Sequence, residues 1–415
     1  MRTVDEHLAS IVGALQPAAP AQVALSEALG LVVAEDVVAR VHLPGFDNSS
    51  MDGYAVRSAS LERAVRDGGV ALTIVGEVAA GGDPDFAVGP GQAARIMTGA
   101  RVPDGADAVI AVEDTDGAAT GEVRCHAEAP AGQFIRRRGE DVSAGSVVVR
   151  RGEVVGPRTI GLLAASGHAQ VLVHPRPHVV VLSTGSELVP PGEPLGPGQI
   201  HDSNSSMLCA AAVAAGASAE VRSAVGDTES QLLAALDEVV AGADAVVTSG
   251  GVSMGAYDVV KAALSGEGVE FVKVAMQPGK PQGFGFLVGP AGRSVPLFAL
   301  PGNPVSSYVS FEVFVRPALR RLMGLVPERR PLRTATLTAA LASPAGRQQY
   351  ARAVVIEGES GLMATPVTGQ GSHFVADLSR ANALLVIPSE TASLDAGDRV
   401  QLILLDGEEC LHVTR

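Results

Sequence analysis

The spacing of hydrophobic residues changes character along the chain. Residues 5–40 carry apolar positions at helical spacing, which predicts two helices. From about residue 70 to 150, short Val, Ile and Ala runs are separated by Gly, Pro and Asp clusters, a pattern typical of small antiparallel strands and hairpins. A short helix is expected over residues 156–168. This first part of the chain therefore predicts a β-rich unit inserted into a mostly helical or elongated part.

Residues 176–323 alternate between β-branched runs and amphipathic segments. One predicted helix closes at Gly216, and the next opens with a capping box from Thr228 to Gln231. Strands that alternate with helices in this way predict a mainly parallel sheet covered on both faces. After Pro327 an alternating pattern returns for about 85 residues and predicts a small β-barrel or sandwich.

Composition narrows the class of protein. A chain of 415 residues is longer than one hydrophobic core usually supports, so we expect more than one domain. The net charge of −14 argues against nucleic-acid binding, because no basic surface is available to neutralise phosphates. We therefore expect no nucleic-acid partner.

The cysteines and the N-terminal residues indicate the cellular compartment in which the protein is expected. Cys125, Cys209 and Cys410 are far apart and lack CxxC spacing, so neither a disulfide framework nor a zinc site is expected. Asp5 and Glu6 stand where a signal peptide would be basic, and no run of about 18 apolar residues occurs. We expect a soluble cytoplasmic protein with no membrane partner.

Loops at the carboxyl ends of the predicted parallel strands share one edge of the sheet, where ligands bind in such folds. Nearly all of these loops consist of Gly, Pro, Ser or Thr with one charged residue. Glycine lets backbone N–H groups approach an oxyanion, and a following helix N-terminus adds partial positive charge. We therefore predict a phosphate-binding edge. The loops are 183–187, 226–228, 248–255, 277–281 and 301–304.

Three carboxylates, Glu187, Asp227 and Asp258, are expected at the same edge. They would repel a phosphate unless a hard divalent cation lay between, with oxygen ligands from both sides. This predicts Mg²⁺ as a cofactor, held by these three acids. The alternative is that Asp227 and Asp258 are only helix N-caps.

The basic residues give a weaker indication. Lys261, Lys273 and Lys280 are the only lysines and fall within twenty positions of each other. Lys273 and Lys280, next to the "PGKP" turn, are candidates to bind an oxyanion. Chance clustering is the alternative, and Lys261 is expected on a solvated helix surface. The histidines, including His201 and His373, have no metal-ligand spacing and are expected not to be ligands.

Seven segments resemble, in this order and at about these spacings, the molybdopterin molybdenumtransferase family, which comprises the bacterial MoeA proteins and the E-domain of gephyrin. The resemblance spans roughly residues 5–330, and beyond that only "GSH" at 371–373 matches. The segments are PGFDNSSMDGYAV (44–56), RIMTGARVPDGADAVI (95–110), RRRGEDV (136–142), LSTGSEL (182–188), SGGVSMGAYD (249–258), MQPGKP (276–281) and LPGNPVSS (300–307).

The resemblance implies a multidomain α/β protein with four parts. It also implies homodimers whose active site lies between the α/β domain of one subunit and the β-unit of the other. The expected parts are an elongated, discontinuous, helical N-terminal domain (1–45 and 133–172), an inserted β-rich domain (46–132), a molybdopterin-binding α/β domain (173–326) and a C-terminal β-barrel (327–415).

The implied reaction is the insertion of molybdate into adenylylated molybdopterin with Mg²⁺, which releases AMP and yields molybdenum cofactor. The implied catalytic set is Asp52, Thr98, Asp141, Glu187, Asp227 and Asp258. The expected substrate-binding set is Ser183, Thr184, Gly185, Ser249, Gly250, Gly251, Ser253, Gly255, Lys273, Lys280, Pro301, Gly302, Asn303, Pro304, Arg136 and Arg137.

Within this mechanism, backbone amides of 249–255 and Lys280 would take phosphate oxygens. The run Arg136-Arg137-Arg138 would bind molybdate, and its alternative is a solvated charge cluster. Asp52 and Thr98 have the alternative role of local turn formers.

One departure from the family pattern is Gln277, where a "KPGKP" sequence would place a second lysine. Two other functions stay open. One is a molybdopterin adenylyltransferase of the same fold, although those are typically single-domain. The other is a non-catalytic scaffold like gephyrin, although this chain has no long linker. The upstream molybdopterin adenylyltransferase is a further candidate partner of this protein.

Overall fold

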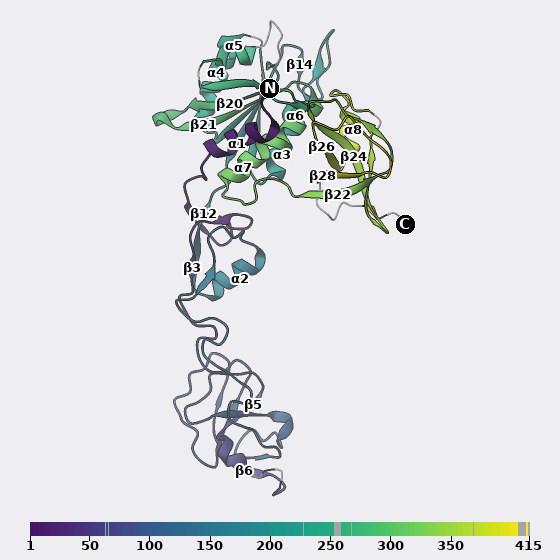
Figure 1. The fold of residues 1–415 in the computed structure, drawn as a ribbon. Coiled ribbons are helices and arrows are strands. Elements are labelled where there is room, and N and C mark those ends of the chain that lie inside the picture. Colours follow the sequence, from purple (N-terminus) through teal and green to yellow (C-terminus); the bar gives the residue numbers. More distant parts are fainter. Residues whose placement is uncertain are drawn as a thin grey trace. The chain divides into compact units, whose positions relative to one another are not determined.

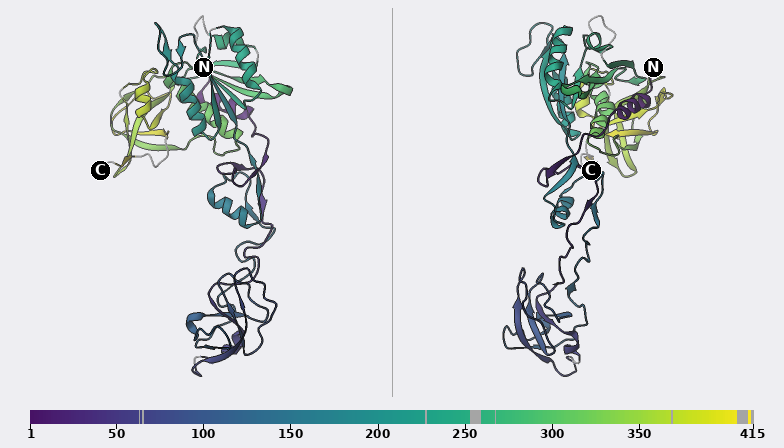
Figure 2. Two further views of the ribbon diagram at one scale, coloured as in Figure 1. Left: turned by 180° about the vertical axis from the view of Figure 1, so that it is seen from behind. Right: turned by 90° about the vertical axis from the view of Figure 1, so that its left-hand side faces the viewer.

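The computed structural model describes residues 1–415 except 63, 65, 227, 253–258, 267, 368, 406–411 and 414–415, with only the backbone at 223–225 and 412–413. It divides into two compact units (Figures 1 and 2). We call Met1–Ala21, Gly30–Ala34 and Val173–Arg415 the main unit, and Gln22–Leu29 with Glu35–Leu172 the inserted unit. The finer division into four domains stays a prediction.

The main unit is built on a six-stranded sheet whose strand order is β16-β13-β17-β21-β20-β18. The first four strands are parallel, and β20 pairs antiparallel with both β21 and β18, so β18 runs in the same direction as the first four. The prediction of a mainly parallel sheet is confirmed. The strands are β13 (His178–Thr184), β16 (Ser218–Val225), β17 (Ala245–Ser249), β18 (Val269–Lys273), β20 (Pro281–Val288) and β21 (Ser294–Leu300).

Both faces of this sheet are buried. Because successive side chains of a strand point to opposite faces, Val179 and Val181 join one apolar cluster while Val180 and Leu182 join the other. Figure 1 shows α4 and α5 on one side of the sheet and α1, α3 and α7 on the other. The helices are α1 (Val4–Ala14), α3 (Ser203–Ala214), α4 (Glu229–Val240), α5 (Val259–Leu264), α6 (Pro304–Ser310) and α7 (Arg316–Leu322), with a π-helical turn at Phe311–Val315.

The C-terminal part of the main unit is a closed β-barrel, which confirms that prediction. Closure follows because β26 pairs with β28 on one side and returns to β24 on the other. The barrel strands are β22 (Leu332–Leu337), β24 (Gln348–Gly358), β25 (Gly361–Pro366), β26 (Ala383–Ile387) and β28 (Arg399–Leu404). Accompanying elements are β19 (Met276–Gln277), β23 (Leu341–Ala342), α8 (Val375–Arg380), β27 (Ser393–Leu394) and β29 (His412–Val413).

The inserted unit contains the expected β-rich region as a five-stranded sheet of order β8-β5-β7-β6-β9. Its pairs are antiparallel except β6 with β7, which are parallel. The strands are β5 (Gly53–Val56), β6 (Val70–Val78), β7 (Gln92–Ile96), β8 (Ala108–Ala111) and β9 (Glu122–Cys125). Outside this sheet lie β4 (Asn48–Ser49), β10 (Ile135–Arg136), β11 (Val147–Val149) and the predicted helix α2 (Pro157–Ala165).

The prediction of two helices over residues 5–40 is wrong beyond the first of them. Only α1 forms in this stretch, and residues 21–38 make short strands instead. Gly30 has a φ of +78°, a left-handed conformation that interrupts a helix, and the β-branched pairs at 32–33 and 37–38 favour extended backbone. These strands are β1 (Ala21–Ala24), β2 (Val32–Val33) and β3 (Val37–Val38), and β1 and β2 flank β12 (Gln170–His174) in a three-stranded sheet. Across the described residues, no helix combines the length and the apolar character that crossing a membrane requires.

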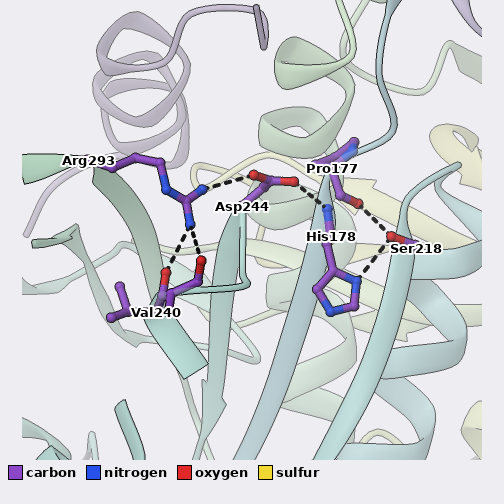
Figure 3. A network of polar contacts seen from close by, with 7 residues as sticks. Pro177, His178, Ser218, Val240, Asp244 and Arg293 are labelled. Atoms are coloured by element: carbon purple, nitrogen blue, oxygen red, sulfur yellow. Dashed lines mark hydrogen bonds and ion pairs between the residues drawn. The ribbon is translucent and has the colours of Figure 1, made fainter. Parts of the chain in front are cut away.

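A polar network closes the amino edge of the parallel sheet (Figure 3). The Asp244 carboxylate accepts from the His178 backbone N–H at 2.9 Å and from Arg293 Nη1 at 3.0 Å. His178 Nδ1 lies 3.1 Å from Ser218 Oγ. Because these residues precede or begin four different strands, the network fixes the starts of the strands relative to one another.

Replacing Asp244 by Ala should lower the free energy of unfolding by about 1 kcal/mol, because the His178 N–H and the Arg293 guanidinium lose their shared acceptor. Urea denaturation would measure the loss. Asp237→Ala, on the exposed face of α4, is the matched control and should change stability by less than about 0.5 kcal/mol. Equal losses in both variants would contradict the assigned role of Asp244.

Candidate functional site

A cavity of about 690 Å³ opens at the carboxyl edge of the parallel sheet. Loops that follow β13, β17 and β21 line it, as predicted for a sheet of this kind. The sequence-predicted residues that it brings together are Ser183, Thr184, Glu187, Ser249, Gly250, Gly251, Pro301, Gly302, Asn303 and Pro304. Their proposed roles stay predictions.

Other predicted residues are not in this lining. Gly185, Lys273 and Lys280 are described but do not line the cavity, although Lys280 directly precedes Pro281, which does. Asp227, Ser253, Gly255 and Asp258 lie outside the described residues. Among the residues that are described, no group of three or more His, Cys, Asp or Glu side chains is placed to hold a metal ion. Glu187 is the one member of the predicted metal set that can be located.

Gly250 explains why the loop after β17 must be bare backbone. Its φ is +100°, and an added Cβ would lie 2.9 Å from the carbonyl oxygen of Thr184. A Cβ added at Gly302 would in turn lie 3.4 Å from the Gly250 Cα. The ends of three strands therefore meet here without side chains between them. The Gly250 N–H donates to Leu300 O at 3.1 Å, so this amide is not available to an oxyanion. In the described part of this loop, the backbone N–H groups of Gly251 and Val252 remain as candidates to bind an oxyanion.

The start of α3 supplies two pocket residues that the sequence analysis missed. Asp202, 8% exposed, caps α3 by accepting from the Ser205 N–H at 3.0 Å, and its same oxygen accepts from Ser183 Oγ at 3.1 Å. Asn204 Nδ2 donates to Gly302 O at 2.7 Å and to Ser249 Oγ at 2.8 Å. The sequence signal was the Asp-Ser-Asn triplet immediately before a helix, which indicates only a cap.

The barrel also contributes to the pocket, through the loop 369–374. His373 lines the cavity. Ser372 Oγ accepts from Asn303 Nδ2 at 2.9 Å, and Ser372 O accepts from the Val305 N–H at 3.1 Å. Arg352 holds this loop from inside the barrel: it is 1% exposed and donates to the carbonyl oxygens of Gly369, Gly371 and Phe374. Burial lowers the pKa of the Arg352 guanidinium, which three carbonyl acceptors nevertheless satisfy.

Gln277, the departure from the family pattern, has a cationic neighbour. Its side-chain oxygen Oε1 accepts from Arg347 Nη1 at 3.2 Å. Arg347 belongs to the segment that leads into β24, and β24 pairs with β19, so the two residues are brought together by strand pairing. A guanidinium therefore lies beside the position where the family pattern has a second lysine.

In the inserted unit, Asp52 and Thr98 are in direct contact. Asp52 Oδ1 accepts from the Thr98 N–H at 2.6 Å and from Thr98 Oγ1 at 2.8 Å. These bonds favour the charged form, so the Thr98 backbone N–H first, and its hydroxyl second, hold the pKa of the Asp52 carboxyl below its ordinary value. Asp141 is exposed, and none of the hydrogen bonds given for the described residues connects it with this pair.

The arginine run differs from its expected role. Arg137 Nη1 lies 2.7 Å from the Asp47 carboxylate, which also accepts from the Arg138 N–H at 2.8 Å. The Arg137 guanidinium is therefore already paired, whereas Arg136 is exposed at the end of β10. Of the three arginines in the predicted molybdate-binding run, Arg137 is therefore the poorest candidate, because its guanidinium has a carboxylate partner.

The Asp52–Thr98 contact has a testable titration. Thr98→Val removes the hydroxyl but keeps the backbone N–H, so the pKa of Asp52 should rise and still remain below its ordinary value. The contact is fully present above the ordinary Asp pKa and is lost as the pH falls through the lowered one. Carboxyl-detected NMR titration would measure the shift. Asp116, whose pKa is lowered by the Arg124 backbone N–H, serves as the control that should not move.

Comparisons with known proteins agree with this organisation. Three family models match in succession: MoeA N-terminal region (domain I and II) over residues 2–167, a probable molybdopterin binding domain over 180–321, and MoeA C-terminal region (domain IV) over 334–405. The chain is 46% identical over 409 residues to molybdopterin molybdenumtransferase 2 of Mycobacterium tuberculosis H37Rv, covering 97% of this chain and 99% of the relative.

A molybdopterin molybdenumtransferase of Bacillus subtilis is 36% identical over 393 residues, covering 93% of this chain and 90% of the relative. Among solved structures, a molybdopterin biosynthesis MoeA protein from Pyrococcus horikoshii has a TM-score of 0.84 at 33% identity, covering 98% of this chain and 99% of the other. The chain therefore belongs to the MoeA family of molybdopterin molybdenumtransferases.

Proposed function

We propose that this protein inserts molybdate into adenylylated molybdopterin in the presence of Mg²⁺, cleaves the phosphoanhydride, releases AMP and forms molybdenum cofactor. The observation that carries the proposal is the 690 Å³ cavity, whose wall comes mainly from the residues matched as a probable molybdopterin binding domain. Its volume lies within the roughly 300–1,000 Å³ of small-molecule sites. Hydroxyl and amide groups in the wall suit a polar, anionic substrate.

The residues present fit a Mg²⁺ ion. Mg²⁺ is usually held by one or two carboxylates together with substrate phosphate oxygens, and the Glu187 carboxylate lines the cavity. The predicted ligands Asp227 and Asp258 would add to this set. When bound, Mg²⁺ would neutralise charge on the phosphoanhydride oxygens.

The chain's own groups have separate tasks in this proposal. The loop around Gly250 lets the substrate approach the backbone closely, since no side chain stands in the way. Lys280, beside the cavity-lining Pro281, and Arg347, held by Gln277, supply positive charge for the phosphate and molybdate oxyanions. Arg136 would add a basic group from the inserted unit.

The two other functions are less well supported. An adenylyltransferase typically consists of the molybdopterin-binding domain alone, whereas this chain matches molybdenumtransferases over 97% of its length. A non-catalytic scaffold would keep the fold and bind molybdopterin but would not release AMP.

The test is to incubate the purified protein with adenylylated molybdopterin, molybdate and Mg²⁺ and to measure AMP. We expect AMP release that requires both molybdate and Mg²⁺. Glu187→Gln should lower the rate at least about tenfold, because it removes a carboxylate from the cavity without changing its size. Glu193→Gln, in the exposed loop after β14 (Leu188–Val189), is the control. AMP release independent of molybdate would contradict the proposal.

We further propose that the protein acts as a homodimer in which the inserted unit of one copy serves the cavity of the other. The family resemblance supports this arrangement, and the catalytic candidates divide accordingly: Asp52 and Thr98 belong to the inserted unit, and Glu187 to the main unit. A stable complex with an adenylyltransferase would deliver the substrate to the same cavity.

Subunit mixing tests the homodimer. Asp52→Asn and Glu187→Gln protomers, each expected to be strongly impaired alone, should recover about one quarter of the wild-type rate after exchange. Half of the dimers are then mixed, and each mixed dimer has one intact site out of two. Analytical ultracentrifugation checks the dimer. A dimer without any recovered activity would show that each active site comes from one chain.

A further inference from the structure

Two buried polar atoms in the wall of the cavity lack a hydrogen-bond partner within the described residues: Thr184 Oγ1, a hydroxyl that can accept or donate, and Asn204 Oδ1. Thr184 is only 7% exposed. Buried polar atoms of native proteins are nearly always hydrogen-bonded, so an unpaired atom in a cavity wall indicates a group that a ligand completes. Both atoms would be satisfied by a ligand that brings hydrogen-bond donors.

The chemistry of Asn204 is fixed by its neighbours. Its Nδ2 lies 2.7 Å from the Gly302 carbonyl oxygen, which can only accept, so the nitrogen must point there. The remaining atom, Oδ1, is therefore an acceptor and cannot donate. The Asp202 carboxylate, on the same first turn of α3, accepts through Oδ1 from Ser183 and Ser205 and has Oδ2 outside both of these bonds. This stretch of wall is consequently rich in acceptors.

The two ring systems of the proposed substrate differ in what they offer to such a wall. The 2-amino-4-oxo ring of a pterin has two adjacent donors, the exocyclic amine and the neighbouring ring N–H. Adenine has one amine flanked by ring nitrogens that accept, and these would face the acceptors of the wall unfavourably. A site built from acceptors therefore discriminates in favour of the pterin.

We propose that Thr184, Asp202 and Asn204 form the pterin-recognition wall of the cavity, binding the donor edge of the pterin ring through Oγ1, Oδ2 and Oδ1. This inference rests on the proposed function, because it assigns one part of that substrate to one part of the cavity. It gives these residues a role in specificity rather than in the chemistry of AMP release.

Thr184→Val is the decisive variant, since it removes an unpaired hydroxyl while nearly keeping the shape of the side chain. Thr248→Val is its matched control: Thr248 is also buried with an unpaired Oγ1, but it does not line the cavity. Binding of molybdopterin and of AMP would be measured separately by fluorescence and calorimetry, in EDTA and again with Mg²⁺. Thermal melting of each variant monitors folding.

We expect Thr184→Val to weaken molybdopterin binding about tenfold, both in EDTA and with Mg²⁺, as the loss of one buried hydrogen bond implies. AMP binding should stay within about twofold of the wild type. Thr248→Val should change neither affinity. Asn204→Leu should reproduce the selective loss of molybdopterin binding, with its melting temperature recorded because its bonds to Gly302 and Ser249 are also removed.

Three results would overturn the inference. Weaker AMP binding with unchanged molybdopterin binding would place adenine at this wall. A loss seen only with Mg²⁺ would make these atoms metal ligands. Unchanged affinities in Thr184→Val would mean that the wall binds neither ring. If the wild type releases AMP with molybdate in any of these cases, only this inference fails, whereas a wild type that does not bind molybdopterin would contradict the proposed function itself.

Discussion

The close approach of backbone at Gly250 is the constraint on which the site depends. The carbonyl oxygen and the side chain of Thr184 leave no room for a Cβ at this position, and a Cβ on Gly302 would lie 3.4 Å from the Gly250 Cα. Because three strand ends are packed so tightly, side chains next to the contact are directed around it. Asn204 can thus reach both Gly302 and Ser249, and this bridge leaves its remaining acceptor buried in the cavity wall without a partner among the described residues. Side chains in this loop would push the strand ends apart and break the contacts that form the cavity wall.

The two edges of the same sheet illustrate different uses of polar groups. At the amino edge, Asp244 links His178 and Arg293, so that its carboxylate has protein partners on both sides. At the carboxyl edge, Thr184 and Asn204 present buried polar atoms that have none in the described protein. Satisfied groups stabilise the fold, whereas unsatisfied groups cost stability and are retained where a ligand can pair with them.

The barrel contributes a loop to the cavity, although it lies at the far end of the sequence from the loops of the parallel sheet. Arg352 places a buried guanidinium against three carbonyl oxygens and so orders the loop that carries Ser372 and His373. That loop in turn bonds to Asn303 and Val305 at the start of α6. Changes deep in the barrel can therefore reach the cavity through a chain of hydrogen bonds rather than through direct contact.

The sequence by itself determined the classes of structure. The β-branched runs at 179–181 and 245–247 specify buried parallel strands, alternation after Pro327 specifies the barrel, and the long motifs specify the family. Local pattern failed at residues 21–38, where short valine pairs and turns carry too little periodicity to separate helix from strand.

Only the tertiary structure decided which polar atoms share the cavity. The contacts of Asn204 with Gly302, of Gln277 with Arg347 and of Arg352 with Gly371 join segments whose spacing follows no local period. They depend on how strands register and pack across the sheet and barrel. Asp202 and Asn204 therefore looked like an ordinary helix cap in the sequence, because their second role exists only once distant strand ends have met.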